Sequence, residues 1–245
     1  MIVKHHEEGW EIISHYAHGL LSGKIAQELR KKLRPQHWLD VLTGIVEHDD
    51  HLLDFDEQDY LTENGTPKDF MMDGGTDAEA LEHAKRVYSN ALQKSQLVAL
   101  MVGRHLAFLY DGLADDFKPM EEFLNEIGSV RGTQRKLYGL KKSEEDSLYN
   151  IMLFCDRLSL ILCQEETPEV GRKLEINRTI EDEQYFISKD SSEHLTVEPW
   201  PFEKEEFTLA FEYRILNRPT FKDCEELESC LNDAEICIKS YTFKK

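Results

Sequence analysis

Residues 38–59 read WLDVLTGIVEHDDHLLDFDEQD and combine an apolar pattern with a dense group of ionisable side chains. The first half predicts a helix with one apolar face, because apolar residues recur at steps of three and four: Trp38, Val41, Leu42, Ile45 and Val46. The same steps lead on to His48 and Asp49. Burying an unpaired carboxylate costs roughly several kcal/mol unless a cation or hydrogen-bond donors meet it. The stretch therefore predicts a core helix whose end fits either a metal ion or the point where the helix leaves the core.

The neighbouring segments carry more polar side chains on apolar faces. Upstream, residues 11–33 predict a helix in which His18 points toward the core beside an apolar stripe. Downstream, the helix in SQLVALMVGRHLAFLYDGL places His105 on its apolar side. Asp156 and Arg157 interrupt LYNIMLFCDRLSLILC, whose apolar residues on all sides predict a central helix. Each of these residues is also compatible with an ordinary hydrogen-bonded or ion-paired position.

Short motifs set the limits of the segments around this core. Thr76 and Glu79 have the spacing of a capping box, which predicts a helix start there. Residues 50–76, before that start, are rich in Asp, Gly and Pro and predict a long functional loop.

Beyond Glu165 the pattern changes from helical to β-type. Five segments predict strands and one predicts a short helix; in chain order they are KLEINRTI, QYFISK, HLTVEPWPF, FTLAFEYRIL, CEELESCLNDA (the helix) and ICIKSYTFK. We therefore expect a mainly α fold, α+β overall, in which residues 1–165 form a helical bundle. Residues 166–245 are expected to form an antiparallel β-rich extension packed on it.

Composition restricts the partners and the compartment. The chain of 245 residues has 29 basic and 48 acidic residues, a formal charge of −19 that disfavours nucleic acid duplexes and anionic membranes. It has no uninterrupted apolar run of membrane-spanning length and no secretory signal pattern, so we expect a cytoplasmic protein. Its five cysteines form no CxxC pair and are expected to be reduced. A homo-oligomer is left open.

Several of the polar residues in apolar patterns have the chemistry of metal ligands. His18, His48, Asp49 and Asp156 arise on three predicted helices, with His105 on a fourth, and a bundle would let them converge. Two imidazoles with two carboxylates suit one or two divalent ions of Mn, Fe, Co, Ni or Zn. A metal-free core of hydrogen-bonded polar groups would also account for them and remains an alternative.

The order of these residues resembles the HD-domain superfamily of metal-dependent phosphohydrolases, which have a helical bundle. More closely, six segments resemble an uncharacterised bacterial family, a domain of unknown function related to HD domains: HYAHGLLSGKIA, GIVEHDDHLLDFDE, GTPKDF, LVALMVGRH, CDRLSLILC and VEPWPF. The resemblance implies that His18 is the first ligand, His48 and Asp49 the HD pair, and Asp156 the closing ligand. His105 would match a histidine that binds a second ion.

The same resemblance implies an activity. The substrate would be a small phosphorylated molecule, a phosphoester or nucleotide-like compound, attacked by a metal-activated water. Asp49, Asp50, His51 and Arg157 are the candidate catalytic residues. Many HD enzymes have Gly-Lys after the pair; this chain does not, so Arg104 or Arg157 would bind the phosphate.

Two further alternatives come from other functional classes. HD-type bundles with two irons also serve as oxygenases, which would require His105 as a true ligand. A non-catalytic scaffold with a structural metal site is the second alternative.

Overall fold

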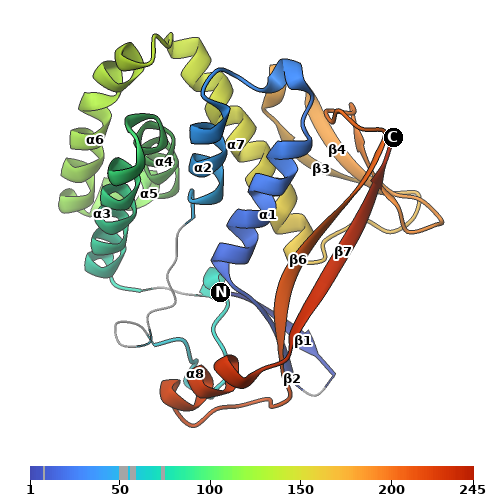
Figure 1. The fold of residues 1–245 in the computed structure, drawn as a ribbon. Helices are drawn as coiled ribbons and strands as arrows, with labels where there is room; N and C mark the ends of the chain where they lie inside the picture. The colour runs from blue at the N-terminus through green and yellow to red at the C-terminus, as the bar shows by residue number, and fades with distance from the viewer. Residues whose placement is uncertain (8, 50–54, 56–58, 73–74) are drawn as a thin grey trace.

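The structure is a computed structural model that describes residues 1–7, 9–49, 55, 59–72 and 75–245 (Figure 1). Its α-helices are α1 (His15–Glu28), α2 (Trp38–Val46), α3 (Asp77–Lys94), α4 (Gln96–Leu109), α5 (Asp111–Asp116), α6 (Lys118–Leu137), α7 (Lys142–Cys163) and α8 (Cys224–Asp233). Three short 3₁₀ helices accompany them in the described ranges: η1 (Lys31–Leu33), η2 (Phe70–Met72) and η3 (Ile180–Asp182).

The strands of the described residues form one seven-stranded sheet in the order β1–β2–β6–β7–β5–β4–β3. The sheet is mixed, because β5 and β7 are parallel where Leu195 faces Phe243, whereas the other neighbours are antiparallel. The strands are β1 (Ile2–His6), β2 (Gly9–Ile13), β3 (Lys173–Arg178), β4 (Gln184–Lys189), β5 (Leu195–Glu198), β6 (Glu206–Leu216) and β7 (Ile236–Lys244).

This sheet shows that the expected fold class is wrong: the chain is α+β, but it is not a mainly helical bundle with an antiparallel extension. The amino-terminal segment contributes two strands, and residues 11–13 of the predicted helix belong to β2 (Gly9–Ile13). Ser14 caps α1 by accepting a hydrogen bond from the backbone N–H of Ala17, so the helix begins only at residue 15. A Cβ on Gly9 would lie 1.9 Å from the carbonyl oxygen of Leu216, so the glycine permits β2 to approach β6.

The individual elements of the carboxyl-terminal part were predicted correctly. All five expected strands and the helix α8 are present, and the capping box of Thr76 and Glu79 begins α3. What the local patterns did not reveal was that β1 and β2 complete the same sheet. The division into residues 1–165 and 166–245 stays a prediction.

The helices α1 and α7 pack against each other and lie between the sheet and the helices α2 to α6 (Figure 1). One hydrophobic core joins these two helices to the sheet; for example, the ring of Phe154 on α7 lies 5.1 Å from the ring of Tyr185 on β4. A second core joins α3, α4 and α6. The central position of α7 agrees with its apolar sequence.

A buried carboxylate fixes α4 and α6 to the start of α7. Glu145 is only 2% exposed and contacts the guanidinium groups of Arg131 and Arg135 on α6. Nη1 of Arg104 on α4 lies 3.5 Å from Oε1 of Glu145 and also binds Asp146. Because Arg104 precedes His105, this network also holds the α4 histidine in place.

We expect Glu145→Ala to lower the free energy of unfolding by about 3 kcal/mol, because it leaves clustered guanidinium groups without their buried partner. Urea titration followed by circular dichroism measures the change. The matched control is Glu122→Ala on α6, an exposed pair with Lys118, which should change stability by less than about 0.5 kcal/mol. Equal effects of the two substitutions would contradict the structural role of Glu145.

Candidate metal centre

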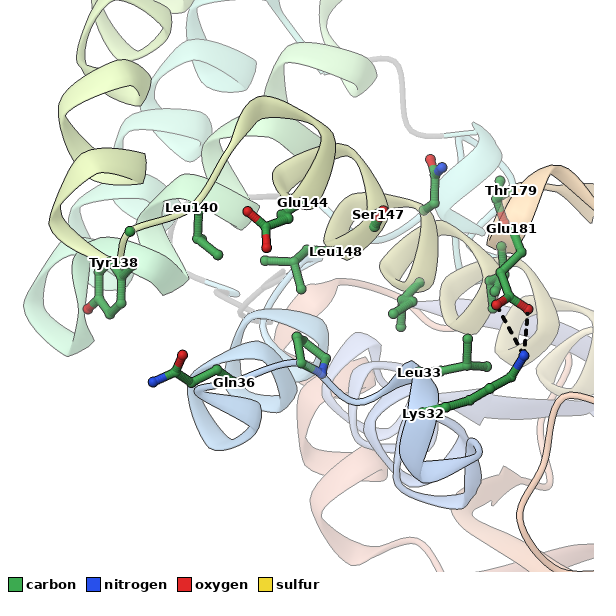
Figure 2. A pocket seen from close by; sticks show the side chains of 15 residues that line it. Lys32, Leu33, Gln36, Tyr138, Leu140, Glu144, Ser147, Leu148, Thr179 and Glu181 are labelled. Atoms are coloured by element: carbon green, nitrogen blue, oxygen red, sulfur yellow. Dashed lines mark hydrogen bonds and ion pairs between the residues drawn. The ribbon is translucent and has the colours of Figure 1, made fainter.

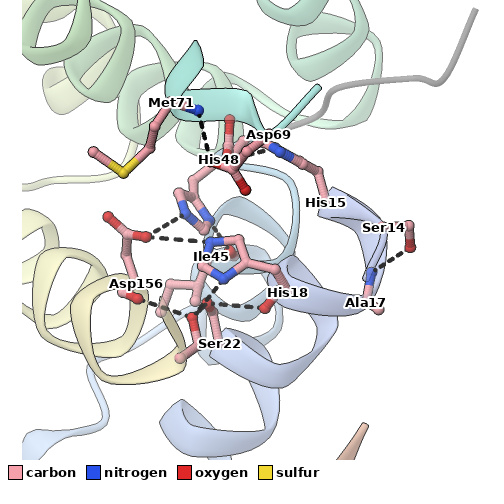
Figure 3. A network of polar contacts seen from close by, with 12 residues as sticks. Ser14, His15, Ala17, His18, Ser22, Ile45, His48, Asp69, Met71 and Asp156 are labelled. Carbon is pink, nitrogen blue, oxygen red and sulfur yellow. Dashed lines mark hydrogen bonds and ion pairs between the residues drawn. The ribbon is translucent and has the colours of Figure 1, made fainter. Parts of the chain in front are cut away.

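The structure brings together the five side chains that the sequence predicted as metal ligands. They form two overlapping groups, one of His18, His48 and Asp49 and the other of His48, His105 and Asp156. Within each group the possible ligand atoms lie within 4.8 Å of one another, and the group could hold a metal ion. The three histidines are at most 2% exposed. Figure 3 shows His18, His48 and Asp156 directed toward one another from α1, the end of α2 and α7.

A close approach of α1 and α2 makes this convergence possible. A Cβ on Gly19 would lie 2.2 Å from the carbonyl oxygen of Val46, so only glycine lets the end of α2 pack against α1 at this point. The ring of His48 follows directly after α2 and lies 5.3 Å from the ring of His18. His105 approaches from α4, with its ring 4.9 Å from that of His48.

The central contact joins two imidazoles to one carboxylate. Nε2 of His18 and Nε2 of His48 each lie 3.2 Å from Oδ1 of Asp156, yet neither nitrogen has a hydrogen-bond partner among the described residues. Nδ1 of His48 lies 2.6 Å from the carbonyl oxygen of Ile45, which can only accept, so Nδ1 carries a proton. In the neutral ring, Nε2 of His48 therefore directs a lone pair toward Asp156. Such a contact is repulsive unless a proton or a metal cation lies between the two atoms.

The electrostatics of the cluster favour a positive charge at this point. Burial by itself lowers the pKa of His48, but the charge of Asp156 and a smaller contribution from Asp49 raise it to about 9. Burial likewise opposes ionisation of Asp156, whereas the charge of His48 holds the pKa of that carboxyl far below its usual range. Burial, assisted by the charge of His48, lowers the pKa of His105 to about 4, so its ring is neutral near neutral pH.

The spacing also fits a shared metal ion. Metal–nitrogen and metal–oxygen bonds of about 2.0–2.2 Å place neighbouring donor atoms of one ion about 3 Å apart. The 3.2 Å separations between Oδ1 of Asp156 and the two Nε2 atoms agree with this value. The buried nitrogen atoms without hydrogen bonds are thus compatible with a shared metal ion as well as with a protonated imidazole.

His15 belongs to this cluster and was not assigned from the sequence. It is 3% exposed, and its Nδ1 lies 3.0 Å from Oδ2 of Asp49, so the ring orients that carboxylate. The ring of Phe70 on η2 packs against His15 with centroids 5.3 Å apart. The signal was present in the chain, because His15 lies three residues before His18 and so on a neighbouring part of the same helix face.

The predicted catalytic residues differ in position. Asp50 and His51 lie outside the described residues. Arg157 is half-buried on α7, one position after Asp156, and makes no hydrogen bond or ion pair with any described residue. Arg104 is already engaged, because it binds Asp146 and stacks 4.6 Å above the ring of Tyr149.

A pocket elsewhere in the molecule does not contribute to the cluster. Its volume is about 360 Å³, and it lies between the connection of α1 and α2, the corner of α6 and α7, and η3 (Figure 2). At one end, Nζ of Lys32 is 3.2 Å from Glu181. Its lining includes none of the five predicted ligands.

Comparison with known families gives a partial identification. Residues 1–218 match the family described as a protein of unknown function (DUF3891). The chain belongs to this family. The expected membership in an uncharacterised family is thereby confirmed, whereas the wider HD relation rests on the sequence resemblance alone. No curated protein and no solved structure matches the chain.

Within the described ranges, no helix has both the length and the apolar character needed to cross a bilayer.

We expect His48→Ala and Asp156→Ala each to weaken binding of Zn²⁺ or Co²⁺ by at least about 100-fold, because each removes a donor at the centre of the cluster. Isothermal titration calorimetry on chelator-treated protein measures the affinity. His83→Ala provides the control, since His83 is a buried histidine on α3 that belongs to neither ligand group. Unchanged affinity in the two cluster variants would place any bound metal elsewhere.

Proposed function

We propose that this protein is a metal-dependent phosphohydrolase related to the HD superfamily. The observation that carries the proposal is the pair of buried Nε2 atoms, of His18 and His48, that face one oxygen of Asp156 without hydrogen bonding to it. The order and chemistry of the converging residues are those that the resemblance to HD enzymes implies. Since the family match carries no activity, phosphoester hydrolysis is inferred from the site and the resemblance together.

The proposed ligands are His18, His48, Asp49 and Asp156, with His105 available for a second ion. Their nitrogen and oxygen donors suit Mn, Fe, Co, Ni or Zn in the divalent state. When bound, such an ion supplies a Lewis acid that lowers the pKa of water and polarises a phosphoryl oxygen.

The chain's own groups would orient the reactants. The ring of His15 holds the carboxylate of Asp49 in one orientation through the 3.0 Å contact, and the side chain of Asp49 is 17% exposed. Asp49 therefore lies where the buried cluster meets solvent and is placed to accept a proton from the attacking water. His105, whose pKa is lowered, stays neutral and adds no charge that would compete with a metal ion.

Arg157 is the cation best placed to bind the phosphate. Arg104 is already bound to acidic partners, whereas Arg157 has none among the described residues. Gln164 directly follows α7 and lies seven positions, about two turns, after Arg157, so the two side chains are on the same side of the helix. Nε2 of Gln164 lies 3.8 Å from Sδ of Met71, which places this face toward η2 and the solvent-exposed side of the cluster.

An apolar surface beside the cluster suits the organic part of a substrate. The ring of Phe108 on α4 lies 6.1 Å from the ring of His105 and is 59% exposed. The side chain of Met71, on η2, is 75% exposed. Small-molecule sites are lined mainly by hydrophobic and aromatic side chains with a few convergent polar groups. We therefore infer a phosphoester whose organic group packs against Phe108.

We expect the protein with added Mn²⁺ or Co²⁺ to release phosphate or nucleoside from a panel of phosphomonoesters and nucleotides. Asp49→Ala should reduce kcat by at least about 100-fold, because it removes a metal ligand and proton acceptor together. A malachite-green assay and chromatography measure the two products. No release by the metal-loaded wild type would refute the phosphohydrolase proposal; oxygen uptake by the iron-loaded protein would instead favour the oxygenase alternative.

We expect Arg157→Ala to raise KM for a phosphomonoester by about tenfold or more while metal affinity stays unchanged, because a charged hydrogen bond to the phosphate contributes about 1.5–3 kcal/mol. Steady-state kinetics and calorimetry measure the two quantities. The control is Arg172→Ala, since Arg172 is 77% exposed and pairs with Glu169 outside the cluster. Equal KM values for both variants and the wild type would exclude Arg157 from phosphate binding.

A further inference from the structure

A pair of buried serines lies behind the imidazole of His18, on the Nδ1 side of the ring and away from the carboxylate of Asp156. Ser22 on α1 and Ser159 on α7 are both 0% exposed, and their Oγ atoms are 2.7 Å apart. Oγ of Ser159 lies 2.8 Å from Nδ1 of His18 and 2.9 Å from the carbonyl oxygen of Asp156. Oγ of Ser22 lies 3.2 Å from the carbonyl oxygen of His18. Figure 3 shows Ser22 next to His18 and Asp156 in this network.

The number of protons in this network determines which nitrogen of His18 is protonated. A hydroxyl donates one hydrogen bond and accepts two, whereas a carbonyl only accepts. With a proton on Nδ1, His18 and Ser22 both donate to Ser159, and Ser159 donates to the carbonyl oxygen of Asp156. These three bonds are the three shortest contacts, at 2.7, 2.8 and 2.9 Å. Only the longest contact, at 3.2 Å, lacks a proton.

The opposite tautomer satisfies fewer contacts. Without a proton on Nδ1, Ser159 has to donate to that nitrogen, so it no longer donates to the carbonyl oxygen of Asp156. The proton would then lie on Nε2 of His18, whose 3.2 Å contact with Oδ1 of Asp156 does not have the geometry of a hydrogen bond. Burial of a donor without an acceptor is unfavourable, and full burial of the serines leaves the network to protein groups alone.

We infer that Ser159 is a positioning residue that fixes His18 in the tautomer with the proton on Nδ1. Nε2 of His18 then directs its lone pair toward Asp156. The neutral ring of His48 has the same arrangement, because its Nδ1 donates to the carbonyl oxygen of Ile45 and its Nε2 faces Asp156. Ser159 also binds the backbone of Asp156, so one hydroxyl aligns ligands from α1 and α7. Ser22 supports Ser159 and does not touch the ring. The consequence for metal binding rests on the proposed function; the tautomer does not.

The tautomer is measured in the metal-free, full-length protein with ¹⁵N-labelled histidine. Imidazole ¹⁵N shifts distinguish the two neutral forms, and loss of signals in His18→Asn assigns His18. Spectra are recorded over a series of pH values, and the tautomer is determined from the neutral form of the ring. We expect the Nδ1–H form in the wild type and a shift toward the Nε2–H form in Ser159→Ala. An Nε2–H form in the wild type, or no change in Ser159→Ala, overturns the inference.

Metal affinity gives an independent measurement. Ser159→Ala should bind Zn²⁺ about 10- to 100-fold more weakly, the usual range when a hydrogen-bond partner of a ligand is lost. Ser22→Ala should lose less. The control is Cys163→Ala, which also removes one buried heavy atom from α7, one turn after Ser159. This variant should bind Zn²⁺ as tightly as the wild type does. Thermal unfolding verifies that each variant folds.

The controls separate the possible failures. An equal loss of affinity in Cys163→Ala would assign the effect to packing and overturn the positioning role. If the wild type binds no metal, the proposed function fails, while the ¹⁵N spectra still decide whether Ser159 sets the tautomer.

Discussion

The structure depends on one electrostatic arrangement: the carboxylate of Asp156 in the centre of α7, facing the Nε2 atoms of His18 and His48. A carboxylate in a largely apolar helix is tolerated only where positive charge or hydrogen-bond donors meet it. The chain brings two imidazoles from other segments to one oxygen atom. The packing of α1 and the end of α2 around α7 is therefore also the assembly of the site.

The features around this arrangement hold it in place from different directions. Gly19 lets the end of α2 approach α1, and the Ile45 carbonyl and Ser159 hydroxyl fix the orientations of the two imidazoles. On the other side, Glu145 connects α7 to α4 and α6 through three arginines. Side chains with this many fixed partners are held in one orientation, which is what a group that could hold a metal ion requires.

The sheet supports the helices that carry the cluster, whereas the sequence suggested a β-rich extension packed on a helical bundle. It forms one hydrophobic core with α1 and α7, so the helices that carry His18 and Asp156 are braced on the side away from α4. β1 and β2 precede α1 directly, and Ser14 makes the transition from strand to helix. The position of His15 and His18 is thus set partly by strand pairing and not only by helix packing.

The sequence by itself determined the local elements and the identity of the polar residues in apolar patterns. His18, His48, His105 and Asp156 could be selected because charge within an apolar period is costly and therefore informative, and the strands from residue 173 onward followed from alternation. Local patterns could not assign residues 11–13 correctly, since so short a segment fits either period. The pairing of β2 with β6, distant in the sequence, decided their conformation. Likewise, only the tertiary structure placed His15 on Asp49 and Ser159 on His18, because hydrogen bonds between distant segments leave no periodic signal in the chain.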